Sequence, residues 1–121
     1  MNNRLVWCDL AVQNLDRAAV FYSKVFQVDL QRMPMPDGEM AMFPFEPGAA
    51  AVSLRTDGIP SAEGALVYLD VGEDLDAALA RVRDAGGAVK LGKTGLPGDH
   101  GFMACILDTE GNRVGLYSRT G

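Results

Sequence analysis

The chain has 121 residues, a formal net charge of −5, and 48% hydrophobic against 22% charged residues. This length suits one domain with a buried core, and an acidic chain is repelled by phosphate backbones, so we expect neither a second domain nor a nucleic-acid partner. No apolar run approaches the ~20 residues of a membrane span and no signal-peptide pattern is present, which predicts a cytoplasmic protein that does not contact membranes.

The two halves of the sequence repeat one pattern at an offset of about 60 residues. Residues 5–12 have the alternating side-chain pattern of a β-strand and lead to an amphipathic helical pattern at residues 14–26. In the second half, residues 66–71 have the strand pattern and residues 74–85 the helical pattern. Asn14 and Asp74 precede these helical patterns, and both residue types are common N-caps. Each half therefore predicts a strand that leads directly into a helix.

The rest of each half predicts three more strands. Residues 38–43 parallel residues 101–106, with Gly, Met and Ala at matching places, and the turn sequences at 36–38 and 108–111 are placed to close hairpins. We therefore predict an α+β fold in a single domain, residues 1–121, built of two tandem βαβββ modules at residues 1–58 and 62–121. Their strands are expected to form a curved eight-stranded mixed sheet around a cavity, with the helices outside.

Residues 12–22 combine the end of an apolar strand with a Leu-Asp-Arg helix start and a Phe-Tyr pair, and residues 108–116 contain an Asp-x-x-Gly-Asn hairpin sequence. These two segments resemble the opening and closing segments of the vicinal oxygen chelate superfamily, the family of glyoxalases, bleomycin resistance proteins and extradiol dioxygenases. The resemblance extends over essentially the whole chain and implies the duplicated βαβββ fold. Because identical modules can pair within one chain or between two, it also leads us to expect a homodimer.

Metal-using members of this superfamily place one ligand on each of four strands. The resemblance puts Trp7, Ser53, Leu66 and Gly115 at these positions, and none is a competent ligand for a divalent transition metal. The chain holds a single histidine, His100. We therefore expect no metal and no other cofactor, and no metal-dependent lactoylglutathione lyase or dioxygenase activity.

Side chains alternate along a strand, which predicts that Trp7, Asp9, Tyr68 and Asp70 lie on the cavity face of the sheet. Aromatic rings with a few polar groups are the usual lining of a small-molecule site, although the same rings could instead fill the interface between modules. The predicted ligand-binding residues are Trp7, Ser53, Tyr68, Phe102, Ala104 and Tyr117.

The face of the seventh strand depends on the turn that follows it, because a shift of one residue exchanges its two faces. A four-residue turn at 108–111 would place Phe102, Ala104 and Ile106 on the cavity face, with His100, and Cys105 on the helix side. Five methionines near the predicted strands either form an adaptable pocket wall or fill the core: Met33, Met35, Met40, Met42 and Met103.

Three functions are consistent with these features. The leading hypothesis is a metal-independent protein that binds a small molecule with apolar or aromatic parts between its modules. The first alternative is a lyase or isomerase that uses His100 with Asp9 or Asp70 as acid and base, since the unperturbed pKa of histidine lies near physiological pH. For the two aspartates, salt bridges to Arg55 or Arg113 are an equally open interpretation. The second alternative is an interaction module whose cavity is filled.

Overall fold

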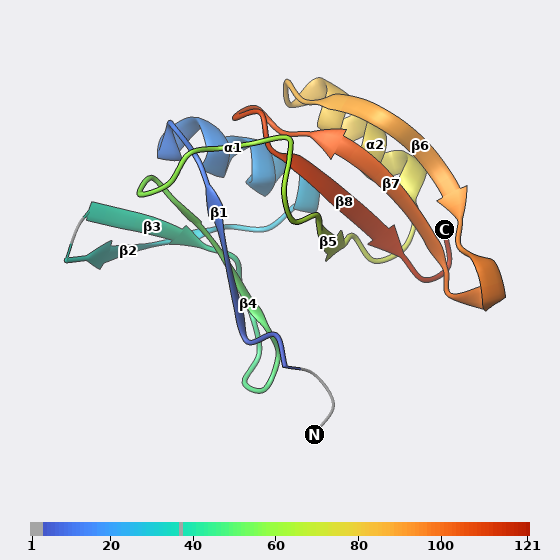
Figure 1. The fold of residues 1–121 in the computed structure, drawn as a ribbon, viewed down its shortest axis with the longest axis horizontal. Coiled ribbons are helices and arrows are strands. Elements are labelled where there is room, and N and C mark those ends of the chain that lie inside the picture. The colour runs from blue at the N-terminus through green and yellow to red at the C-terminus, as the bar shows by residue number, and fades with distance from the viewer. Residues whose placement is uncertain (1–3, 37) are drawn as a thin grey trace.

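Two helices and eight strands appear in the predicted order in the computed structural model, which describes residues 4–36 and 38–121 (Figure 1). The elements are β1 (Trp7–Ala11), α1 (Leu15–Phe26), β2 (Gln31–Met35), β3 (Gly38–Met42), β4 (Ala51–Arg55), β5 (Val67–Asp70), α2 (Leu75–Asp84), β6 (Ala88–Gly95), a short 3-10 helix (Pro97–Asp99), β7 (Phe102–Leu107) and β8 (Arg113–Ser118). The α+β fold of two βαβββ modules is confirmed. No helix in the described part of the chain is long and apolar enough to cross a bilayer.

The strands form two four-stranded sheets, one for each module. Their orders are β1-β4-β3-β2 and β5-β8-β7-β6. In each sheet the first strand of the module runs parallel to its last, and the other neighbours are antiparallel. Within one chain the strands therefore do not join into the continuous eight-stranded sheet expected from the sequence. The edge strands β1 and β5 do not pair, because the modules meet through their helices and the β7–β8 turn instead.

Both helices begin where the sequence predicts. The side chain of Asn14 accepts a hydrogen bond from the backbone N–H of Arg17 (2.9 Å), and that of Asp74 accepts one from Ala77 (3.0 Å). These contacts satisfy backbone donors that the first turn of a helix leaves without partners. Helix α1 ends at Gln27, which adopts a left-handed conformation with φ of 56°.

Side chains of both modules share one hydrophobic cluster. Leu10 and Leu54 contribute from the first sheet and Ile106 and Leu116 from the second, all under the helices and at most 8% exposed. The helix side of each sheet is thus covered. Within residues 4–36 and 38–121 no helix covers the opposite side, and the two sheets diverge below α1 (Figure 1).

The turn between β7 and β8 joins the second module to the start of α1. Glu110 accepts hydrogen bonds from the backbone N–H groups of Gln13 and Asn14, both at 2.9 Å, and from the Arg17 guanidinium at 2.7 Å. The Asn112 amide donates to the carbonyl of Ala11 (2.7 Å). The closing Asp-x-x-Gly-Asn motif therefore fixes how the two modules pack against each other.

Candidate functional site

Each sheet has one face opposite its helix, which we call the open face. On the first sheet Leu10 and Leu54 pack in the core, so their neighbours Trp7, Asp9 and Ser53 occupy the open face, as predicted. Cys8 lies on the helix side, where burial, and secondarily the nearby Asp9 carboxylate, raises the pKa of its thiol. A protonated thiol is a poor nucleophile, so Cys8 has a packing role.

A hydrogen-bonded network connects the residues of the first open face. The Trp7 indole Nε1 donates to the Ser53 hydroxyl (3.0 Å) and to the Asp9 carboxylate (3.1 Å), and the Ser53 hydroxyl donates to Asp9. The Arg55 guanidinium lies 3.9 Å from the carboxylate of Asp9 and 3.4 Å from the carboxylate of Asp57. The interpretation of Asp9 as the ion-pair partner of Arg55 is confirmed, and this network fixes the orientation of the indole ring.

Tyr68 is the half-exposed aromatic residue on the open face of the second sheet. Strand β5 pairs with β8 so that Tyr68 lies beside Gly115, and a Cβ at Gly115 would be only 2.4 Å from the Tyr68 ring. The phenol ring therefore rests directly on the glycine backbone. Ser53 holds the corresponding place in the first sheet and is fully buried beside the indole of Trp7. Each sheet thus carries an aromatic ring against a small residue, and both rings are about half exposed.

The residues at the superfamily's ligand positions do not fit a transition-metal ion. Ser53 is already hydrogen-bonded within its own network, Gly115 lies under a ring, and Trp7 and Leu66 offer no lone pair suited to such a metal. Throughout residues 4–36 and 38–121, no three or more His, Cys, Asp or Glu side chains gather in a group that could hold a metal ion.

Strand β7 has the opposite facing from the one predicted. Leu107 pairs with Arg113 and Cys105 with Gly115, so the turn contains five residues, 108–112, rather than four. Asp108 organises the longer turn, because its carboxylate accepts hydrogen bonds from the backbone N–H groups two and four residues later (2.8 and 2.9 Å).

The extra turn residue exchanges the two faces of β7. Ala104 and Ile106 are fully buried in the core and Phe102 packs against it, so the prediction that these three side chains line the cavity face is wrong. Met103 and Cys105 take their place on the open face beside Tyr117 and Gly115.

The three candidate acid–base residues engage different partners. Asp9 belongs to the Trp7 network, whereas Asp70 accepts a hydrogen bond from the backbone N–H of Gly72 (2.8 Å) and so shapes the loop before α2. The backbone carbonyl of His100 accepts a hydrogen bond from the Tyr117 hydroxyl (2.6 Å). None of the hydrogen bonds among the described residues joins His100 to Asp9 or Asp70.

The hollows of a single chain lie mainly outside the open faces. A groove of about 570 Å³ lies between the exposed side of α1 and β2, and its lining includes Asp16, Val20 and Arg32. A smaller hollow of about 260 Å³ lies between the modules, with Asp9 and Arg113 among its lining residues. Arg32 forms an ion pair with Asp16, so part of the charge in the larger groove is already compensated.

Comparison with protein families matches residues 4–116 to the model described as the Glyoxalase/Bleomycin resistance protein/Dioxygenase superfamily. The chain belongs to this superfamily. The match includes both modules of the fold and both segments that resemble the superfamily in the sequence. Comparison with curated proteins gives no match.

Solved structures show the glyoxalase-type fold at low sequence identity. A hypothetical protein SA1046 from S. aureus shares 24% identity and a TM-score of 0.72, with 98% of this chain and 95% of that chain covered. TnmS3, an antibiotic-binding protein from Streptomyces sp. CB03234, shares 23% identity and a TM-score of 0.69, with 98% of both chains covered. A glyoxalase I mutant from Zea mays shares 22% identity and a TM-score of 0.68; 94% of this chain matches 46% of that one.

Proposed function

We propose that this protein binds a small organic molecule with apolar or aromatic parts on its open faces, without a metal at the superfamily's ligand positions. The observation that carries the proposal is the pair of rings over small residues. Trp7 is 44% exposed beside Ser53, and Tyr68 is 49% exposed over Gly115. Where metal-using relatives need donor atoms, this chain presents flat apolar surfaces.

These surfaces suit a planar or apolar ligand for physical reasons. Aromatic rings bury large areas on contact, and offset stacking adds about 0.5–1.5 kcal/mol for each pair. The indole is held in place by Ser53 and Asp9, so little conformational freedom is lost when a ligand stacks on it. The nearby ion pair of Asp9 and Arg55 supplies polar groups that could orient the ligand.

A second copy of the chain is part of this proposal. The open faces carry half-exposed rings but are not enclosed within one chain, and ligand sites normally bury most of the ligand surface. Pairing of two copies would cover these faces and turn an open surface into a cavity. The antibiotic-binding protein among the structural neighbours supports a binding role, since it shares the fold over the whole chain.

A screen of small molecules that reads both thermal stability and tryptophan fluorescence tests the proposal. Trp7 is the only tryptophan, so its emission reports directly on the open face. We expect flat aromatic compounds to change this emission. A ligand at a concentration of about 100 times its dissociation constant should add about 2.7 kcal/mol to the free energy of unfolding and raise the midpoint of thermal unfolding by several degrees. The Tyr68→Ala substitution should weaken binding of such a ligand about tenfold.

Val20→Ala is the matched control, because Val20 lies on the exposed side of α1 in the larger groove. It should leave affinity unchanged. If Val20→Ala weakened binding and Tyr68→Ala did not, the ligand would sit in the outer groove. Turnover of the methylglyoxal–glutathione adduct that depends on added nickel or zinc would contradict the metal-free part of the proposal.

A further inference from the structure

Four of the six methionines in the sequence gather on the open face of the β2–β3 hairpin. They come from two Met-x-Met segments, Met33 with Met35 on β2 and Met40 with Met42 on β3. Residues two apart share a strand face. Ala41, between the second pair, lies in the main core on the helix side, which places Met40 and Met42 on the opposite side.

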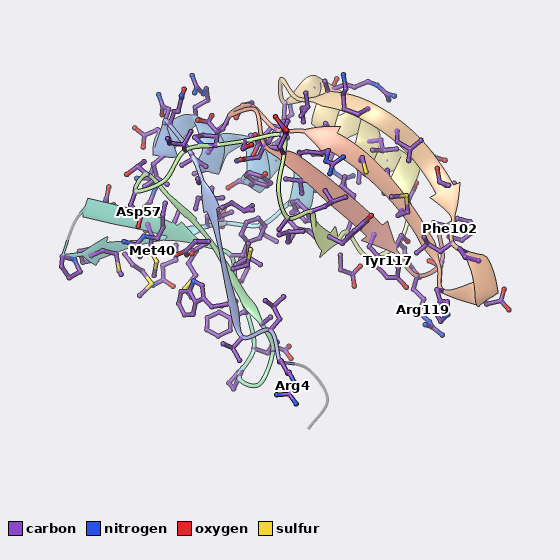
Figure 2. All side chains as sticks on the ribbon, viewed as in Figure 1. Arg4, Met40, Asp57, Phe102, Tyr117 and Arg119 are labelled. Carbon is purple, nitrogen blue, oxygen red and sulfur yellow. The ribbon has the colours of Figure 1, made fainter. Side chains whose placement is uncertain are left out.

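The strand register places a methionine on each side of a central pair. Met33 pairs directly with Met40, so their Cβ atoms are about 4.5–5.5 Å apart; Met42 is the diagonal neighbour of Met33 and Met35 that of Met40, each at about 7–8 Å. Met40 and Met42 are 4% and 7% exposed, while Met33 and Met35 are partly buried against them. In Figure 2 yellow sulfur atoms gather beside the labelled Met40.

The distribution of methionine argues against simple core filling. Among the described residues, the main core cluster is built of aliphatic and aromatic side chains and holds no buried methionine. The second, smaller cluster contains two of the three buried methionines of the described residues, Met40 and Met42, together with Ala51. Methionine has three rotatable side-chain bonds, so the thioethers of the Met33–Met40 pair and of one diagonal neighbour can turn toward one point.

Thioether sulfur is a soft, neutral donor that favours monovalent copper, whereas oxygen and imidazole donors favour harder ions. The charges nearby are compatible with a bound cation. Arg55 lies opposite Met40 in the register, but its guanidinium is close to the carboxylates of Asp9 and Asp57, so this group carries a net negative formal charge.

We propose that the Met33–Met40 pair, with the thioether of Met35 or of Met42 as a third donor, forms a binding site for a soft monovalent cation, Cu(I) or its redox-inert analogue Ag(I). The site lies on β2 and β3, whereas the superfamily's ligand positions in this module fall at Trp7 and Ser53 on β1 and β4. The cation site does not depend on the organic ligand proposed above, because it needs only the methionine sulfur atoms.

Titration with Ag(I), followed by NMR of methionine ε-methyl groups labelled with carbon-13, tests the site directly. The methyl signals of the four clustered methionines should shift together, and that of Met103, on the second sheet, should not. Thioethers carry no proton at any accessible pH, so the affinity should be equal at about pH 5 and pH 7, whereas binding to the thiolates of Cys8 or Cys105 would weaken in acid.

The double variant Met33→Leu/Met40→Leu removes two donors while conserving side-chain volume. We expect its Cu(I) affinity, measured anaerobically against a competing chelator, to fall about tenfold or more with little change in the thermal midpoint. Met103→Leu is the matched control and should retain full affinity. Unchanged affinity in the double variant, a methyl shift at Met103 equal to the others, or affinity that falls in acid would each overturn the proposal.

Discussion

At the scale of single residues, Glu110 shows how one carboxylate holds the two modules together. Its side chain is enclosed by the turn and the start of α1, and hydrogen bonds from the Arg17 guanidinium and from the backbone of Asn14 and Gln13 outweigh the effect of burial. They lower the pKa of Glu110 from 4.5 to about 2. The ionised form is therefore the one that stabilises the fold.

Because the folded-state pKa of Glu110 lies below its ordinary value, this stabilisation is complete above about pH 4.5 and is lost as the pH falls toward about 2. Glu110→Gln removes the charge and should lower the free energy of unfolding by about 2 kcal/mol at pH 7. Urea denaturation at several pH values measures this effect. The difference from the unaltered protein should disappear near pH 2; a difference that is constant with pH would show that the charge is unimportant.

At the scale of elements, Gly87, directly before β6, permits a close approach of the chain to β7 and to helix α1. A Cβ at this position would lie 2.7 Å from the carbonyl oxygen of Leu107 on β7 and 2.7 Å from the Phe21 ring on α1. The contact with Leu107 involves backbone, which cannot rotate away. Gly87 therefore serves packing rather than a special backbone angle.

Gly87→Ala should destabilise the fold by about 1–3 kcal/mol, because an added methyl group in a filled space forces its neighbours to move. Gly92→Ala, on the strand that begins directly after Gly87, is the matched control, since nothing lies within 4 Å of its Cβ position. Thermal denaturation followed by circular dichroism compares the two. Equal midpoints for the two variants would mean that the space around Gly87 relaxes at little cost.

Local patterns in the sequence predicted the elements well, because strands, helices and caps depend on neighbouring residues. Asn14 and Asp74 cap the helices as expected. The facing of β7 could not be predicted in the same way, since it depends on whether the carboxylate of Asp108 organises four or five turn residues. One residue in that turn moves Ala104 from a predicted ligand contact into the core.

The candidate site was only partly predictable for a related reason. Alternation along β1 placed Trp7 and Asp9 on one face, and the same rule placed Tyr68, but no local pattern shows which strands become neighbours. The contact of Tyr68 with Gly115 arises from the parallel pairing of β5 with β8. Likewise, the opposition of Met33 and Met40 follows from the register of the hairpin.

At the scale of the whole molecule, the N-terminal end of β1, β4 and the loop between β3 and β4 extend away from the helices (Figure 1). This extension carries exposed apolar side chains on both sides: Leu5, Val6, Trp7 and Phe45. The rings of Trp7 and Phe45 are 6.4 Å apart at their centroids. Contiguous exposed apolar surface of this kind marks an interaction site, which is why we expect two copies to associate here.

The unaltered protein should sediment with twice the mass of one chain, and Val6→Glu should therefore produce a monomer. Val6 is 73% exposed in a single chain, so the charge should not disturb the fold. Val20→Glu is closely matched, because Val20 is 68% exposed but lies on the outer side of α1. Analytical ultracentrifugation distinguishes the outcomes: a dimer that survives Val6→Glu but not Val20→Glu would place the interface on the helix side.

The contacts of the β7–β8 turn also constrain the order in which the chain can acquire its structure during synthesis. Asn112 bonds to Ala11 across 101 positions, and Glu110 bonds to Gln13 across 97. Contacts between such distant segments form slowly, because a long loop must close first. The first module emerges from the ribosome before the second, yet the start of its helix lacks these partners until residue 112 has been added. Until then the apolar surfaces of the first module remain exposed, and nascent chains of this protein should depend on chaperones to prevent aggregation during that interval.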